Sequence, residues 1–127
     1  MKILVIDNDI NINSLIKSIL TTEPDYTVDF AFNGREGLDK IRQNRPNLVM
    51  VDFNMPEING IDLCRIMEKD DSLKTIPVII VSAMPINSKE FQEANGNFQN
   101  ISVVKGLLEK PFDINSLLNK VKEAASF

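Results

Sequence analysis

Residues 48–52 have the sequence LVMVD, four apolar residues followed by an aspartate. The same form recurs at residues 3–7 (ILVID) and 78–82 (VIIVS), with a weaker version at residues 107–109 (LLE). These runs are too short for buried helices, and continuous apolar runs of this length are typical of strands covered on both faces of a parallel sheet. Residues 26–32 mix aromatic and β-branched residues with an acid, and they predict an edge strand.

Helical patterns fill the stretches between these runs. The first is one apolar stripe made by Ile12, Leu15, Ile16, Ile19 and Leu20. Asp9, Asn11 and Asn13 are candidate N-caps of this helix, and Asp9 is the favoured one. Further helices are predicted at residues 34–44, 58–67 and 114–121, and Asp113 is the expected cap of the last.

The segment from residue 83 to residue 105 has the least regular pattern. Residues 88–94 predict a short helix, residues 95–97 predict a turn, and the apolar positions in residues 98–104 predict a further helical turn. We therefore expect a short or broken fourth helix here. With it, strand and helix alternate five times, which predicts an α/β fold: a doubly wound, five-stranded parallel sheet flanked by five helices.

Composition narrows the range of functions. The chain of 127 residues is predicted to form one domain, and its net charge of −4 argues against direct nucleic-acid binding. It contains no histidine, which excludes Ser-His-Asp triads and histidine metal sites. The single cysteine, Cys64, excludes an internal disulfide. No apolar run reaches the roughly twenty residues of a membrane span, so we expect a cytoplasmic domain without membrane insertion.

Polar side chains follow the predicted strands. Asp7 follows the first apolar run, Asp52 and Ser82 end two others, and Lys110 follows the last. Ligands of open parallel sheets bind beyond the carboxyl ends of the strands, so these four side chains should meet at one edge. Each alone is more often a turn former, a helix cap or a solvated lysine. The prediction of a site depends on their arriving together.

The expected cluster has a definite chemistry. Two neighbouring carboxylates repel each other and attract a cation, and oxygen ligands suit Mg²⁺. Magnesium and a lysine can neutralise the charge on a transferring phosphoryl group, and a carboxylate can accept that group as a nucleophile. Because the chain has no histidine, the phosphoryl donor must be another molecule.

The motifs at these strand ends resemble one family. Asp7 after ILVI, the stretch VDFNMPEING at residues 51–60, VSA at residues 81–83 and EKPF at residues 109–112 together resemble the response-regulator receiver domains of two-component systems, in order along the whole chain. The resemblance implies a flavodoxin-like receiver fold with strand order 2-1-3-4-5.

The resemblance also implies residue roles. Asp52 would be the phosphoacceptor, Asp7 would hold Mg²⁺ together with Asp52, and Asn54 would offer its backbone carbonyl to the metal. Ser82 would bind a phosphoryl oxygen and act as a switch, and Lys110 would pair with the phosphate. The Lys110–Pro111 peptide would be cis, and Gly60 would form a tight turn.

The implied partners are a sensor histidine kinase or a histidine phosphotransfer protein as donor, and an unknown protein target. Such a domain is not an enzyme in the usual sense, since it catalyses only its own phosphorylation and dephosphorylation. The resemblance leaves open whether the chain is a chemotaxis-type single-domain regulator or the receiver part of a longer protein.

Two positions depart from the family pattern. The family places a second acid where this chain has Asn8, a possible ligand that brings no charge, so we expect weaker magnesium binding. Asp9 could replace that acid, but capping the first helix is the favoured role. Leu107 occupies the position of the usual switch aromatic, so the switch is expected to be weak or to be carried by residues 83–105.

Two other functions fit the same fold. One is a binding module that acts without phosphorylation, which the presence of Asp52, Ser82 and Lys110 disfavours. The other is a flavin- or nucleotide-binding enzyme. It is disfavoured because the chain lacks GxGxxG and GxxxxGK[ST], and its first strand-to-helix loop is acidic.

Overall fold

The computed structural model describes residues 1–85, 88–95 and 100–126, in which five strands alternate with five helices. The predicted alternation is therefore confirmed. In chain order the elements are β1 (Lys2–Ile6), α1 (Ile10–Leu20), β2 (Thr27–Ala31), α2 (Gly34–Asn44), β3 (Leu48–Asp52), α3 (Gly60–Lys69), β4 (Val78–Ser82), α4 (Lys89–Asn95), β5 (Val104–Glu109) and α5 (Ile114–Ala125).

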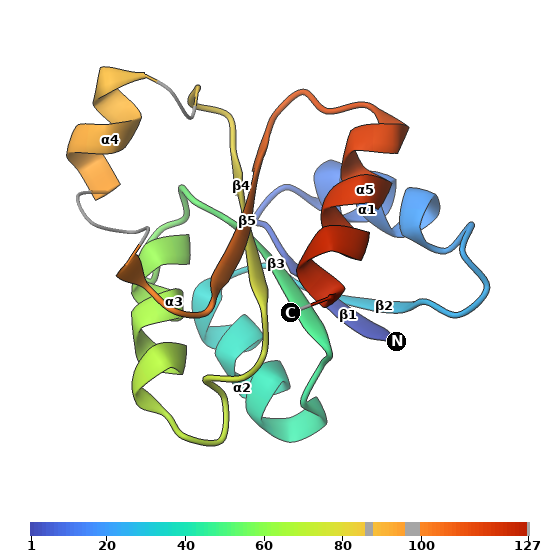
Figure 1. Ribbon diagram of the computed structural model, residues 1–127, viewed down its shortest axis with the longest axis horizontal. Coiled ribbons are helices and arrows are strands. Elements are labelled where there is room, and N and C mark those ends of the chain that lie inside the picture. The colour runs from blue at the N-terminus through green and yellow to red at the C-terminus, as the bar shows by residue number, and fades with distance from the viewer. Residues whose placement is uncertain (86–87, 96–99, 127) are drawn as a thin grey trace.

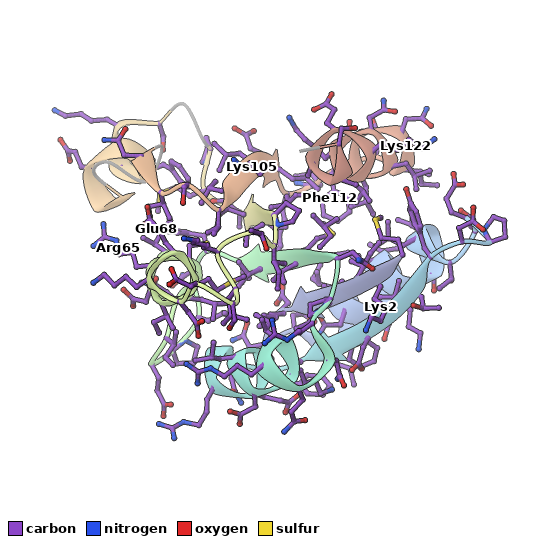
Figure 2. The ribbon with its side chains drawn as sticks, turned by 60° about the horizontal axis from the view of Figure 1, so that its bottom comes forward. Lys2, Arg65, Glu68, Lys105, Phe112 and Lys122 are labelled. Atoms are coloured by element: carbon purple, nitrogen blue, oxygen red, sulfur yellow. The ribbon has the colours of Figure 1, made fainter. Side chains whose placement is uncertain are left out.

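All strand pairs are parallel, and the strand order is β2-β1-β3-β4-β5, as expected. The sheet separates α1 and α5 from α2 and α3, and both faces are covered (Figures 1 and 2). Each face has its own buried apolar cluster, which explains why β1, β3 and β4 are apolar at almost every position. No helix in the part of the chain that the structure describes is long and apolar enough to cross a membrane.

The sheet topology places the ends of β1 and β3 side by side. The chain leaves β1 toward β2 on one side and later returns to β3 on the other, so strand order reverses between β1 and β3. Ile6 of β1 pairs with Val51 of β3, which brings Asp7 and Asp52 to the same edge. Crevices at such reversal points are where ligands bind in open α/β sheets.

Four of the helices have an asparagine or an aspartate as their N-cap. Asp9 and Asp113 accept hydrogen bonds from backbone N–H groups in the first turns of α1 and α5, which confirms both predicted caps. Asn33 and Asn59 do the same for α2 and α3. The prediction that the third helix begins at residue 58 is wrong, because the Asn59 cap makes Gly60 its first residue.

Two predictions about apolar side chains need correction. Leu15 was placed in the inward stripe of α1, but it is 49% exposed, and the buried residues of this helix are Asn13, Ile16 and Leu20. Val104 was assigned to a helical turn, but it is the first residue of β5 and pairs with Val78. The short fourth helix is confirmed as α4. Of the turn predicted at residues 95–97, Asn95 is the last residue of α4, and residues 96–97, like Phe98, lie outside the described residues.

Candidate functional site

Asp7 and Asp52 are buried carboxylates at the ends of neighbouring strands. Their exposed fractions are 2% and 8%. The Asp7 Oδ1 atom accepts a hydrogen bond of 2.9 Å from the backbone N–H of Asp9. This bond spans the loop between β1 and α1, and it restricts the rotation of the Asp7 carboxylate.

Lys110 directly follows β5, and its ammonium group lies beside these two carboxylates. Its Nζ donates to Asp7 Oδ2 at 2.9 Å and lies 3.6 Å from Asp52 Oδ1. The lysine backbone is held by a 2.7 Å hydrogen bond from its N–H to the Ser82 carbonyl, at the end of β4. The peptide bond to Pro111 is cis, as expected.

The charges at this site are incompletely balanced. Burial, followed by the negative charge of Asp7, raises the pKa of Asp52 above its usual range, although Lys110 and the backbone N–H of Asn54 partly oppose this. Burial alone would lower the pKa of Lys110, but its hydrogen bond to Asp7 and the charges of both carboxylates outweigh burial and raise it. Two carboxylates and one ammonium leave the cluster attractive to a further cation.

The Ser82 hydroxyl is engaged by its own loop. It donates to the Met84 carbonyl at 2.8 Å and accepts from the Met84 backbone N–H at 3.0 Å. Ser82 therefore lies at the edge where the sequence placed it, but it acts here as a turn former. A phosphoryl oxygen would have to replace Met84 as its partner.

A pocket of about 430 Å³ opens over Asp52. It is lined by Asp52, Phe53, Asn54, Ala83, Met84 and Lys110. Gly60 keeps the floor of this site compact, since a Cβ atom there would lie 2.8 Å from the Asp52 carbonyl oxygen. Gly60 is the first residue of α3, so this close approach, rather than the predicted tight turn, accounts for the glycine.

The donor set fits Mg²⁺ with few protein ligands. Asp7 and Asp52 supply carboxylate oxygens beside an open pocket, and magnesium keeps several waters in such sites. Asn8 is exposed at this edge, and Asp9 is engaged as the cap of α1. Within the described ranges no three His, Cys, Asp or Glu side chains lie close enough to form a metal cage.

Comparison of the sequence with known protein families identifies the family of this chain. The model described as "Response regulator receiver domain" matches residues 3–122. This chain is a response regulator receiver domain. Proteins with this domain act in two-component signalling, interact with histidine kinases or phosphotransfer proteins, and use Mg²⁺ for phosphorylation.

Relatives of the receiver domain differ in length. The response regulator ArlR of Staphylococcus saprophyticus is 31% identical over 121 residues, which cover 95% of this chain and 50% of ArlR. The polar-differentiation response regulator DivK of Brucella anthropi is 28% identical over 119 residues, covering 94% of this chain and 90% of DivK. The chain thus spans about half of one curated relative and most of another.

Solved structures share the fold over nearly the whole chain. The Francisella response regulator 1452 receiver domain has a TM-score of 0.80 and 31% identity, covering 98% of this chain and 96% of its own. A putative response regulator from Chloroflexus aurantiacus has a TM-score of 0.85 and 25% identity, covering 99% and 98%. The chemotaxis protein CheY4 of Vibrio cholerae has a TM-score of 0.82 and 26% identity, covering 97% of both chains.

Two residues next to the site were missed in the sequence. Asn13 contacts the backbone of Asp7, and Met84 holds the Ser82 hydroxyl. From the sequence, Asn13 was only a candidate N-cap of the first helix, a role that Asp9 has in the structure. The Met84 interaction is made by backbone atoms, which no side-chain pattern reveals.

Proposed function

We propose that the receiver domain, over residues 1–127, accepts a phosphoryl group from a phosphohistidine onto Asp52 in a Mg²⁺-dependent reaction, and thereby switches a protein-interaction surface. The observation that carries the proposal is the position of Asp52. The residue is only 8% exposed, borders an open pocket and has both Asp7 and Lys110 beside its carboxylate. A nucleophile in this setting is shielded from water yet open to an incoming phosphoryl group.

The transfer is a substitution at phosphorus. A carboxylate oxygen of Asp52 forms the new O–P bond, while the P–N bond of the donor breaks and its electron pair stays on the imidazole nitrogen. Lys110, held beside Asp52, offsets the negative charge of the phosphoryl oxygens. When bound, Mg²⁺ supplies further positive charge to the same oxygens.

Asp7 and Asp52 would hold the metal with their carboxylates, and Asn54 with its backbone carbonyl. Asn8 is a possible further ligand, but its amide adds no negative charge. Affinity for divalent cations depends on the number of charged ligands. We therefore expect this receiver domain to bind Mg²⁺ more weakly than one with an acid at residue 8.

The switch would begin at Ser82. Donating its O–H to a phosphoryl oxygen would break the hydrogen bond that Ser82 now donates to the Met84 carbonyl, at the start of the segment 83–105. Leu107 lacks the hydroxyl and ring of the usual switch residue, although it packs against the core cluster that also contains Phe91 of α4. The response is therefore expected mainly in the β4–α4 segment.

The partners follow from the chemistry. The donor is a sensor histidine kinase or a histidine phosphotransfer protein, because the chain has no histidine of its own. The target is an unidentified protein rather than nucleic acid, given the net charge of −4. A cytoplasmic location suits both. In this role the domain catalyses only its own phosphorylation and dephosphorylation.

Intact mass measured after incubation with acetyl phosphate tests the proposal. We expect a gain of one phosphoryl group that requires Mg²⁺ and is absent from Asp52→Asn. No gain at high magnesium with several small donors would instead favour a module that binds its partner without phosphorylation.

A further inference from the structure

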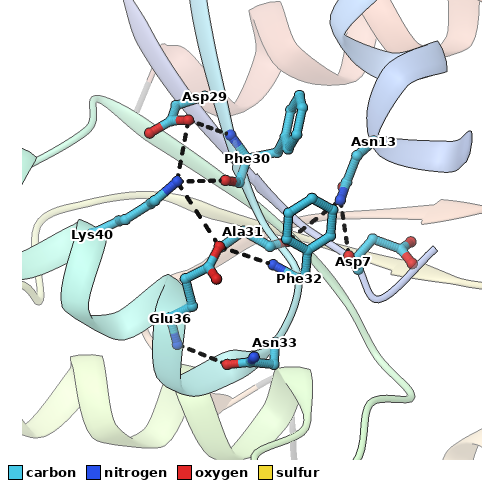
Figure 3. Close-up of polar contacts among 9 residues, drawn as sticks. All are labelled: Asp7, Asn13, Asp29, Phe30, Ala31, Phe32, Asn33, Glu36 and Lys40. Atoms are coloured by element: carbon cyan, nitrogen blue, oxygen red, sulfur yellow. Dashed lines mark hydrogen bonds and ion pairs between the residues drawn. The ribbon is translucent and has the colours of Figure 1, made fainter. Parts of the chain in front are cut away.

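Asn13 is a fully buried polar residue on the inward side of α1, with an exposed fraction of 0%. Its side-chain nitrogen donates to the Asp7 carbonyl at 2.9 Å and to the Ala31 carbonyl at 3.4 Å (Figure 3). Its Oδ1 atom is buried as well and has no hydrogen-bond partner among the described residues. The amide nitrogen is thus hydrogen-bonded, whereas burying the unpaired amide oxygen costs free energy.

The two carbonyls that Asn13 binds are at the ends of neighbouring strands. Asp7 follows β1, and Ala31 is the last residue of β2. The backbone N–H of Asp7 also donates to the Ala31 carbonyl, at 3.1 Å. Asn13 therefore ties α1 to both strand ends at the residue whose carboxylate faces Lys110.

Asp7 is consequently held at three points besides its place in the sheet. Asn13 binds its carbonyl, the Asp9 N–H binds Oδ1, and Lys110 binds Oδ2. Of these, the Asn13 contact is the one that acts on the backbone. Residue 8 brings no charge, and Asp9 is engaged as the cap of α1, so metal binding beside Asp52 would depend on the placement of Asp7.

We propose that Asn13 is a positioning residue for Asp7, and that its amide sets the affinity of the site for Mg²⁺. The inference rests on the proposed function. A leucine has the same branched shape and the same number of side-chain heavy atoms, and it would bury no unpaired oxygen, so a purely structural role favours an apolar side chain here. The amide gives the Asp7 carbonyl a donor that an apolar residue cannot supply.

The test is the substitution Asn13→Leu in the whole chain. The dissociation constant for Mg²⁺ is measured by calorimetry on unphosphorylated protein, and the thermal midpoint is measured in chelator. We expect about tenfold weaker magnesium binding, the lower range for loss of a group that orients a metal ligand, with an unchanged or higher midpoint. Asn11→Leu, at an exposed position of the same helix, is the matched control and should leave both values unchanged.

Magnesium affinity within twofold of wild type would overturn the role of Asn13. If Asn13→Leu does not fold, Asn13→Ser and Asn13→Ala are compared, because serine keeps one donor. Tighter binding by the serine variant supports the inference, and equal binding overturns it. A wild-type chain that binds Mg²⁺ and gains a phosphoryl group while Asn13→Leu behaves identically would contradict this inference alone. A wild-type chain that did neither would contradict the proposed function as well.

Discussion

The Nζ atom of Lys110 lies 2.9 Å from Oδ2 of Asp7, although the two residues are 103 positions apart in the sequence. The same ammonium lies 3.6 Å from Asp52, so one cation serves two buried carboxylates. This shared ion pair links the carboxyl ends of β1, β3 and β5. It also leaves a surplus of negative charge, from which the first two predictions follow.

Lys110→Met should destabilise the chain. The variant keeps the length of the side chain but leaves both carboxylates without their ammonium, at a cost of about 2 kcal/mol in the free energy of unfolding. Urea denaturation in chelator measures this loss, and saturating Mg²⁺ should recover most of it by binding the folded state. Lys120→Met, which removes a more exposed lysine paired with Glu123, serves as control. Equal losses in the two variants would contradict the shared ion pair.

Asp52→Asn should stabilise the chain near neutral pH, by about 1 kcal/mol, because it removes a charge that is costly to bury while Lys110 keeps Asp7 as partner. The pKa of Asp52 is raised in the folded state, chiefly by burial, so the wild type loses stability as pH rises through that pKa. The variant lacks this loss, and its advantage should therefore grow with pH.

The control for this pH dependence has the opposite sign. Hydrogen bonds from Ser116 lower the pKa of Asp113, so its contribution to stability is lost as pH falls through that pKa. Asp113→Asn should therefore change the stability curve at the acidic end. An advantage of Asp52→Asn that was constant from acidic to neutral pH would argue against a buried, charge-strained Asp52.

Asn8→Asp should tighten magnesium binding by roughly tenfold and speed phosphorylation by acetyl phosphate, because it adds a charged oxygen ligand at the edge of the site. Calorimetric titration and the initial rate of mass gain measure the two effects. Asn11→Asp adds the same charge away from the site and should change neither by more than twofold. If Asn8→Asp and wild type had equal affinities, Asn8 would not be the reason for a weak site.

The β4–α4 segment should respond when the phosphoryl site is filled. Phe53 follows the phosphoacceptor, and its ring centroid lies 5.3 Å from that of Phe91, a fully buried residue of α4. Beryllofluoride binding should therefore shift the amide resonances of Met84 and of the described part of α4. Phe91→Leu should reduce the α4 shifts and keep those of Met84. Spectra that changed only around Asp52 would exclude a switching role for this segment.

The strand ends of the site could be predicted because apolar runs locate buried strands, and parallel strands end at a common edge. This reasoning placed Asp7, Asp52 and Lys110 together without any knowledge of distances. It considered Asn13 only as a candidate cap, because the contacts of Asn13 with Asp7 and Ala31 depend on how α1 is rotated against β1 and β2. The same rotation exposes Leu15, which a spacing rule had assigned to the core.

The start of β5 and the partners of the Ser82 hydroxyl were also harder to predict. Val104 has the spacing of a helical turn with Ile101, yet pairing with Val78 makes it part of β5. A tertiary contact, rather than local preference, thus determines the place of Val104. The Ser82 hydroxyl is predicted to bind a phosphoryl oxygen, and its present partners are two backbone atoms of Met84, which no side-chain pattern reveals. The Ser82 bonds are local, since they join residues two positions apart.

The acceptor carboxylate can be identified directly by borohydride trapping. Borohydride reduces an acyl phosphate to an alcohol, which converts a phosphorylated aspartate into homoserine that peptide mass spectrometry can locate. After treatment with acetyl phosphate and Mg²⁺, the proposed function predicts homoserine at residue 52 alone, and none when magnesium is omitted. Homoserine at Asp7 or at another acid, or an unmodified Asp52 in a chain that has gained a phosphoryl group, would contradict the assignment of Asp52 as the phosphoacceptor.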